Sequence, residues 1–383
     1  MRRLWIVVLA LSLLVPLGVP AGAVELDVAG KSALLMDAAT GQVLYEKNAH
    51  EALAPASVTK VMTMLLIMEA IDAGKIGWND MVTASETAAA KGGSQIYLKA
   101  GESMSVSDMV KSIAVSSAND CACAMAEFIA GSEVAFVAQM NKRARELGME
   151  HTHFVNCTGL DDESEAAQHL TCAYDIAVMS RQLLVHHPDI KKFTTIWMDT
   201  VRNGSFGLAN TNKLVRFYQG ATGLKTGFTA KAGYCLSASA LRDGMELIAV
   251  VMGAENSKDR FAACKSMLDY GFANFALVAP ETKNGSVAVK MGTHGYVEAV
   301  PAQQVQLLVD KGQRNDVTVQ VQLEESVEAP VSRGQKLGTL TVRSGEQILA
   351  QISMVAAESV PKLTWGQIFV GLLRRICMGQ WQQ

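Results

Sequence analysis

The sequence predicts an α/β domain whose sheet is built from both ends of the domain, followed by a small all-β domain and a C-terminal amphipathic helix. Three observations support this fold class. Strand-like segments occur at the beginning and end of residues 24–276, with helix-like segments between them. Short, strand-like segments separated by polar turns fill residues 277–360. Residues 361–383 carry apolar side chains at helical spacing.

The α/β domain is expected to begin with two strands. Ser32–Met36 is an apolar run, residues 37–41 supply a turn, and Val43–Tyr45 continues as a second strand.

A series of helices is expected next. Val61–Ala73 is apolar on all sides, is rich in good helix formers and ends at Gly74, so it should be a buried core helix. One later segment opens with Asn119-Asp120, a pair suited to an N-cap. The later helical segments are 106–115, 120–130, 135–147 and 172–184.

The end of the α/β domain returns to strands. Gly233–Ala240 and Leu247–Met252 are apolar runs separated by Arg242-Asp243-Gly244, which predicts a hairpin. A closing helix is expected over 259–272. The following β domain should contain strands at 287–289, 305–309, 317–323, 334–342 and 348–355, and it shows no obvious catalytic cluster.

The tail has apolar residues on one helical face, at spacings of four, three and four: Trp365, Phe369, Leu372 and Ile376. Arg374 and Arg375 lie beside them, and Trp381 follows. This pattern favours a helix at a membrane surface, too short and too charged to span it. A helix docked on the β domain is the alternative.

The first 23 residues have the features of a secretory signal peptide. Arg2 and Arg3 precede an apolar run from Leu4 to Leu17, and Ala21-Gly22-Ala23 provides a small-residue cleavage pattern. A membrane-spanning anchor is disfavoured because this run is short and prolines interrupt the region. We therefore expect a mature chain that begins near Val24 and is exported.

Composition indicates an ordinary globular protein, with 49% hydrophobic and 19% charged residues. The net charge of −3 gives no sign of nucleic-acid binding. The seven cysteines fit neither a disulfide framework nor a metal-binding spacing, so we expect small buried side chains.

A candidate nucleophile and a candidate base lie in Ser57-Val58-Thr59-Lys60. Residues three apart on a helix are neighbours, so Lys60 can reach the Ser57 hydroxyl. Ala54-Pro55-Ala56 precedes this segment and resembles a helix entry, where backbone N–H groups favour a developing oxyanion. A Ser-x-x-Lys pattern alone is a weak signal, because it also occurs on solvated helices.

Two further motifs strengthen the signal: Ser117-Ala118-Asn119 and Lys225-Thr226-Gly227, which precedes the expected hairpin. The three motifs in this order are the signature of serine β-lactamases and penicillin-binding proteins.

With these motifs, residues 30–272 resemble D-alanyl-D-alanine carboxypeptidases, the low-molecular-mass penicillin-binding proteins of peptidase family S11. Further matching segments are His169-Leu170-Thr171, Asn210-Thr211-Asn212 and Gly223-Leu224 before Lys225. The resemblance implies the transpeptidase fold of serine β-lactamases and penicillin-binding proteins, with an antiparallel sheet flanked by helices. It also implies removal of the terminal D-alanine from peptidoglycan stem peptides at the outer face of the bacterial cytoplasmic membrane, with β-lactams as covalent inhibitors.

The resemblance assigns catalytic roles to three residues. Ser57 would attack the carbonyl between two D-alanines and form an acyl-enzyme. Lys60 would be the base, provided that burial or a nearby cation such as Lys225 lowers its pKa. Ser117 would relay a proton to the leaving amine. No metal or organic cofactor is implied.

Other residues would bind the substrate. Asn119 would donate a hydrogen bond to an amide carbonyl of the substrate. Lys225 and Thr226, in the motif that ends at Gly227, would bind the terminal carboxylate of the substrate. Arg260 would complete this cationic clamp, although an exposed helix charge is an equally simple interpretation. The backbone N–H groups of Ser57 and Phe228 would form the oxyanion hole.

Three alternatives stay open. A D,D-endopeptidase would use the same residues. A β-lactamase is less favoured, because no Glu-x-x-x-Asn pattern lies between the second and third motifs. A non-catalytic peptidoglycan-binding protein is disfavoured because Ser57, Lys60, Ser117 and Lys225 are all present.

Overall fold

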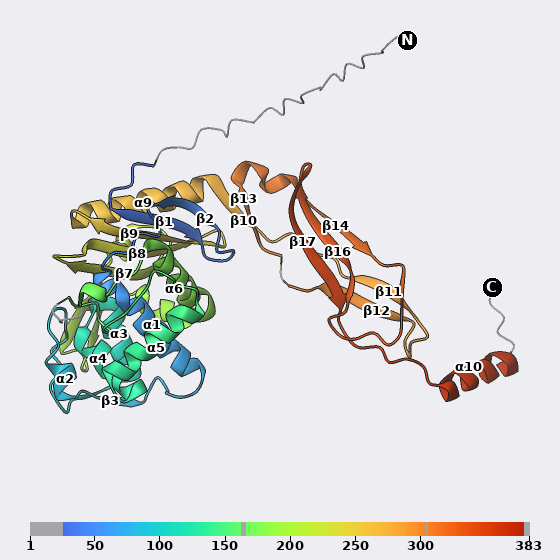
Figure 1. The fold of residues 1–383 in the computed structure, drawn as a ribbon, viewed down its shortest axis with the longest axis horizontal. Helices are drawn as coiled ribbons and strands as arrows, with labels where there is room; N and C mark the ends of the chain where they lie inside the picture. The colour runs from blue at the N-terminus through green and yellow to red at the C-terminus, as the bar shows by residue number, and fades with distance from the viewer. Residues whose placement is uncertain (1–25, 162–165, 304, 379–383) are drawn as a thin grey trace, which may run out of the picture.

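The computed structural model describes residues 26–161, 166–303 and 305–378. The expected signal peptide and Trp381 lie outside these residues. Along the chain, an α/β domain is followed by an elongated β domain and a terminal helix that projects beyond it (Figure 1).

A five-stranded antiparallel sheet with the order β2-β1-β9-β8-β7 forms the centre of the first domain. As predicted, both ends of the domain contribute to it, and the expected hairpin is β8–β9. The strands are β1 (Ser32–Asp37), β2 (Val43–Lys47), β7 (Ala221–Thr229), β8 (Gly233–Arg242) and β9 (Met245–Ala254).

Successive side chains of β1 point to opposite faces of the sheet, so the strand contributes to a hydrophobic core on each face. Leu34 and Met36 join the core shared with the helical region, whereas Ala33 and Leu35 join the core beneath α9 (Ser257–Asn274). In Figure 1, α9 lies along one face of the sheet, and the long helices of the helical region lie on the opposite side.

The helical region surrounds the apolar helix α1 (Lys60–Asp72), which is buried along nearly its whole length. The other long helices are α3 (Val106–Ser116), α4 (Asn119–Ala130), α5 (Glu133–Glu146) and α6 (Ala173–His186), and the short ones are α2 (Glu86–Ala89), α7 (Lys191–Thr194) and α8 (Leu214–Phe217). Two small two-stranded sheets complete the region: β3 (Met81–Thr83) with β4 (Ser103–Ser105), and β5 (Met198–Val201) with β6 (Phe206–Ala209).

The predicted N-cap of α4 is wrong. Ala118 occupies the N-cap position, and Asn119 and Asp120 belong to the first turn. Instead of capping, the Asp120 carboxylate accepts hydrogen bonds from the backbone N–H groups of Ile96 and Leu98. The polar pair therefore anchors a neighbouring loop to the helix.

The β domain contains a six-stranded sheet with the order β14-β16-β17-β12-β11-β15. The strands expected near 287–289, 317–323, 334–342 and 348–355 are present, whereas the sequence analysis missed β12 and β15. The bounds are β11 (Gly285–Lys290), β12 (Tyr296–Pro301), β14 (Val317–Leu323), β15 (Ser326–Glu328), β16 (Lys336–Ser344) and β17 (Gln347–Ala356).

One expected strand does not join this sheet. The segment predicted at 305–309 forms β13 (Leu307–Asp310), which pairs with β10 (Phe275–Val278) in a separate two-stranded sheet. Since β10 begins directly after α9, this two-stranded sheet lies at the connection between the helix and the β domain (Figure 1).

The terminal helix α10 (Trp365–Met378) exposes the expected apolar residues instead of packing them on the β domain. The exposed fractions are 87% for Trp365, 63% for Phe369, 53% for Leu372 and 71% for Ile376. Within the described residues, no single helix combines the length and hydropathy needed to cross a membrane; α4 and α5, bent by 84°, satisfy these two criteria only as a pair.

Candidate active site

Ser57 lies in a short 3₁₀ turn, Ala56–Thr59, that leads directly into α1. The expected helix entry is therefore tighter than an α-helix, and Pro55 is the N-cap residue. Side chains three residues apart are eclipsed in a 3₁₀ turn, which aligns Ser57 with Lys60. Ala56 has a φ of +49°, a conformation that costs backbone energy and is common next to functional residues.

Lys60 is fully buried, and its amine contacts the Ser57 hydroxyl. Its Nζ lies 3.0 Å from Ser57 Oγ and donates to the Thr158 carbonyl at 2.8 Å. Burial lowers the pKa of Lys60 to about 7, although the negative charge of Asp120 acts in the opposite direction. A large fraction of the amine is therefore neutral near neutral pH, as a base for Ser57 requires.

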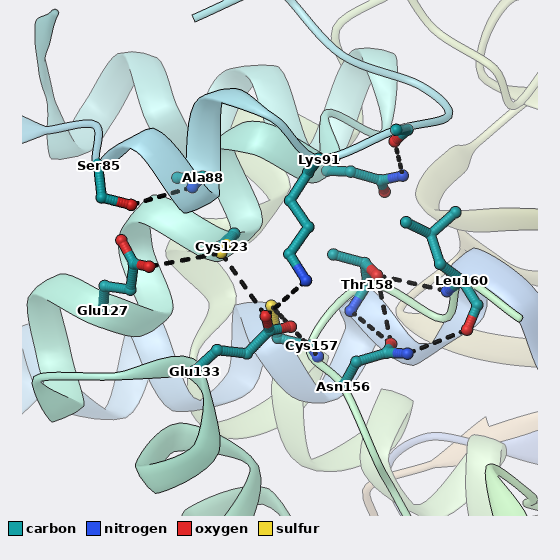
Figure 2. Close-up of polar contacts among 12 residues, drawn as sticks. Ser85, Ala88, Lys91, Cys123, Glu127, Glu133, Asn156, Cys157, Thr158 and Leu160 are labelled. Atoms are coloured by element: carbon teal, nitrogen blue, oxygen red, sulfur yellow. Dashed lines mark hydrogen bonds and ion pairs between the residues drawn. The ribbon is translucent and has the colours of Figure 1, made fainter. Parts of the chain in front are cut away.

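The loop that supplies the Thr158 carbonyl is held by its own hydrogen bonds (Figure 2). Asn156 Oδ1 accepts from the backbone N–H groups of Thr158 and Gly159, and Asn156 Nδ2 donates to the Leu160 carbonyl. Gly159 permits close packing, since a Cβ there would lie 1.9 Å from the Ala56 carbonyl oxygen. The loop thus fits directly against the turn that carries Ser57.

His169, part of a motif noted in the sequence, fixes this turn from another side. The Val155 N–H donates to His169 Nδ1, so the ring proton is on Nε2 and is directed at Thr59 Oγ1, 2.8 Å away. The Thr59 hydroxyl in turn donates to the Ala56 carbonyl. Burial and then nearby positive charges lower the pKa of His169 to about 4, so the ring is neutral.

Strand β7 carries the Lys-Thr-Gly motif across the site from Ser57. A Cβ at Gly227 would lie 2.7 Å from the Pro55 carbonyl oxygen, so only glycine allows the strand to approach the 3₁₀ turn this closely. Phe228 follows directly, with a side chain that is 53% exposed. The close approach brings the backbone on both sides of the expected oxyanion hole together.

Lys225 is buried and donates to the Thr226 carbonyl at 2.9 Å. Burial, followed by the positive charges of Lys60 and Arg260, lowers the pKa of Lys225 well below its usual range. Of the two expected causes, burial lowers the pKa of Lys60, and the cation Lys225 is not among the groups that shift it.

The motif Ser117-Ala118-Asn119 contains polar side-chain atoms that have no hydrogen-bond partner among the described residues. Ser117 is the C-cap of α3 with a φ of +63°, and its buried hydroxyl makes no hydrogen bond there. Asn119 donates through Nδ2 to the Gly92 carbonyl at 2.7 Å, while its buried Oδ1 is unpartnered. Such atoms are costly unless a ligand or water satisfies them.

Arg260 is 7% exposed, so the interpretation as an exposed helix charge is wrong. Its Nη1 donates to the carbonyls of Gly227 and Cys235, which ties α9 to β7 and β8. Its Nε has no partner in the described part of the chain. Nearby, Thr226 Oγ1 donates to Thr211 Oγ1, so the middle residue of Asn210-Thr211-Asn212 reaches the motif strand.

Sequence reasoning missed the group that orients the amine, the Thr158 backbone carbonyl, because no side-chain motif encodes it. It also missed Glu133, which contacts the same loop. Among the cysteine side chains that the structure describes, six are buried and free, as expected: Cys121, Cys123, Cys157, Cys172, Cys235 and Cys264. In the described residues, no group of three or more His, Cys, Asp or Glu could hold a metal ion.

Known proteins resemble this chain in sequence and in fold. The D-alanyl-D-alanine carboxypeptidase family profile matches residues 20–256, and the C-terminal domain of penicillin-binding protein 5 matches residues 272–362. The chain is 45% identical over 364 residues to the D-alanyl-D-alanine carboxypeptidase DacF of Bacillus subtilis, covering 93% of this chain and 91% of that protein.

Solved structures are similar as well. Penicillin-binding protein 5 from Haemophilus influenzae has a TM-score of 0.77 and 29% identity over 89% of this chain and 100% of that one. Penicillin-binding protein D2 from Listeria monocytogenes, in its ampicillin-bound form, has a TM-score of 0.59 and 30% identity over 65% of this chain and 99% of that one.

The pKa of Lys60 predicts how the reaction of Ser57 depends on pH. A protonated amine cannot accept the Ser57 proton, so acylation by labelled ampicillin should rise with pH through about 7. At pH 5 it should be about a hundredfold slower than on the plateau. Lys60→Arg, which stays charged, should react poorly at every pH. A wild-type rate that is constant from pH 5 to 8 would contradict Lys60 as the base.

Proposed function

The chain belongs to the D-alanyl-D-alanine carboxypeptidase family, and on this premise we propose that it removes the terminal D-alanine from peptidoglycan stem peptides through an acyl-enzyme on Ser57. It is a serine-type D-Ala-D-Ala carboxypeptidase. The contact between the buried Lys60 amine and the Ser57 hydroxyl is the main observation that supports the proposed route.

The first step is attack on the carbonyl between the two D-alanines. Lys60 takes the Ser57 proton, and the hydroxyl oxygen forms a tetrahedral intermediate with the substrate carbon. The N–H groups of Ser57 and Phe228 stabilise the oxyanion, a role consistent with the close packing at Gly227. When the C–N bond breaks, the departing amine needs a proton. The unpartnered Ser117 hydroxyl is suited to pass that proton from Lys60.

Substrate binding uses the groups around β7. Asn119 retains hydrogen-bonding capacity beyond its bond to Gly92, and it holds the peptide amide. Lys225, Thr226 and Arg260 bind the terminal carboxylate at the Gly227 end of the strand. Arg260 contributes its charge and its unpartnered Nε while its Nη1 bonds keep β7 in place. Water then attacks the acyl-enzyme, with Lys60 again as the base.

A second part of the proposal concerns location. We propose that the protein is exported and held peripherally at the outer face of the cytoplasmic membrane by α10. The four exposed apolar side chains would enter the lipid, and Arg374, which is exposed on the opposite side of the helix, would face the anionic headgroups.

The reaction is tested by D-alanine release from diacetyl-L-Lys-D-Ala-D-Ala. Residues 24–383 should release D-alanine, and Ser57→Ala should lower kcat by several orders of magnitude while the circular dichroism spectrum and Tm stay unchanged. Release that persists in Ser57→Ala would contradict the assigned nucleophile. Ampicillin hydrolysis without D-alanine release would instead indicate a β-lactamase.

The carboxylate clamp is tested with Arg260→Ala on two substrates, one with a free terminal carboxylate and one with a terminal amide. Loss of a charge-assisted hydrogen bond should raise KM for the free carboxylate about tenfold or more. The amidated substrate should be affected much less. Arg260→Lys separates the loss of charge from the loss of the Gly227 contact. Equal losses on both substrates would show that Arg260 only supports β7.

Membrane attachment is tested by sedimentation with vesicles of phosphatidylglycerol and phosphatidylcholine. Trp365→Ser/Phe369→Ser should weaken binding at least about tenfold, since two large apolar side chains no longer enter the lipid. Gly371→Ser, on the opposite side of the same helix, should bind normally. All three proteins should release D-alanine from soluble peptide equally. Equal sedimentation of the double variant and the wild type would contradict the proposed helix face.

A further inference from the structure

Beside the loop that contacts Lys60, a partly buried ion pair joins Lys91 and Glu133 (Figure 2). Lys91 Nζ lies 2.7 Å from Glu133 Oε2, and the two side chains are only 14% and 15% exposed. The other oxygen, Glu133 Oε1, accepts from both the backbone N–H and the thiol of Cys157, each at 3.1 Å. One carboxylate therefore fixes Cys157 at two atoms.

The charge states of these groups suit this arrangement. Burial raises the pKa of Glu133, but hydrogen bonds from Lys91 and Cys157 outweigh that effect and leave the pKa below its usual value. Burial raises the pKa of the Cys157 thiol well above its usual range. The thiol is therefore a protonated donor, and the carboxylate is an ionised acceptor.

Cys157 directly precedes Thr158, whose carbonyl accepts from the Lys60 amine. The Cys157 carbonyl is itself held, because it accepts from Thr63 Oγ1 on α1 at 2.6 Å. Asn156 restrains the loop on the other side of Cys157. Glu133, Thr63 and Asn156 thus restrain three successive peptide units, the last of which carries the Thr158 carbonyl that contacts the base.

The same ion pair also reaches the substrate side of the site. Lys91 is followed by Gly92, whose carbonyl accepts from Asn119 Nδ2 at 2.7 Å. A Cβ at Gly93 would lie 2.8 Å from the same nitrogen, so this loop packs tightly on Asn119. Lys91 and Glu133 therefore connect the loop that packs on Asn119 to the loop that contacts Lys60.

We propose that Glu133 is a positioning residue for the Lys60 base, because it fixes Cys157 so that the Thr158 carbonyl orients the amine. This inference rests on the proposed function of Lys60. A neutral amine has two N–H bonds and one lone pair. When one N–H donates to Thr158, the rotation that remains about the amine is limited, and the lone pair can be directed at Ser57 Oγ.

Several charged or titratable groups surround Lys60 and determine whether a substitution raises or lowers its pKa. They are Lys225 on β7, Asp120 on α4, Cys157 in the loop, and His169 near the 3₁₀ turn. Loosening the loop would admit water to the amine, weaken desolvation and raise the pKa of Lys60. Removing a distant negative charge without loosening would lower that pKa.

The test measures acylation by labelled ampicillin from pH 5 to 9 in Glu133→Gln. We expect the second-order rate constant at pH 7 to fall about tenfold, because a slightly misplaced catalytic group is costly. The acid limb of the pH–rate profile, where acylation falls as Lys60 becomes protonated, should have its midpoint shifted upward from about 7, by about half a pH unit or more. Cys157→Ala, which removes only the thiol bond, should show a smaller effect in the same direction.

The matched control is Glu127→Gln on α4. Its carboxylate accepts a weak contact from the Cys123 thiol at 3.9 Å, and that thiol in turn lies 3.7 Å from Glu133 Oε2, so Glu127 is one contact further from Cys157. It should acylate like the wild type across the pH range. A purely structural role for Glu133 would lower the Tm without moving the acid limb, and that result would overturn the proposal, as would a downward shift. If the wild type itself fails to acylate, the proposed function fails, independently of Glu133.

Discussion

Burial of the Lys60 amine against the Ser57 hydroxyl is the constraint on which the rest of the catalytic domain depends. A lysine whose pKa falls from 10.5 to about 7 destabilises the folded state by roughly 4 kcal/mol near neutral pH. Surrounding structure must offset that cost. Helix α1 does so because its apolar residues are buried on every side and hold the first turn rigidly in the core.

The order of strands in the sheet places the Lys-Thr-Gly strand, β7, opposite Ser57 and Lys60. Because β1 and β2 come from the start of the domain and β7 to β9 from its end, the sheet brings the Lys-Thr-Gly strand to the turn that carries Ser57. Glycine at 227 sets how closely the two segments meet. Arg260 on α9 ties the same strand to a helix on the opposite face of the sheet from α1, so that helix also maintains the geometry of the site.

The parts of this structure that follow from local pattern could be predicted from the sequence. The Ser57 and Lys60 spacing, the apolar α1 and the β8–β9 hairpin are examples. The parts set by long-range packing could not. Arg260 looks like a surface charge in a helical pattern, yet it is buried because the carbonyls of Gly227 and Cys235 meet it. Thr158 acts through its backbone carbonyl, which no side-chain motif encodes. The order of strands in the β domain depends on which strands pair, and the alternation of apolar and polar residues within a strand does not show this. The separate β10–β13 pair is an example.

The six buried, free thiols make the domain a reporter of its own local opening. Each is unreactive while covered, so an alkylating reagent labels it only when the element around it opens. The labelling rate of one thiol then measures the opening free energy of one element, without any introduced probe. Three regions are sampled: the helical core, the active-site loop and the sheet with its covering helix. The thiols are Cys121 and Cys123 in α4, Cys172 at the start of α6, Cys157 beside Lys60, Cys235 in β8 and Cys264 in α9.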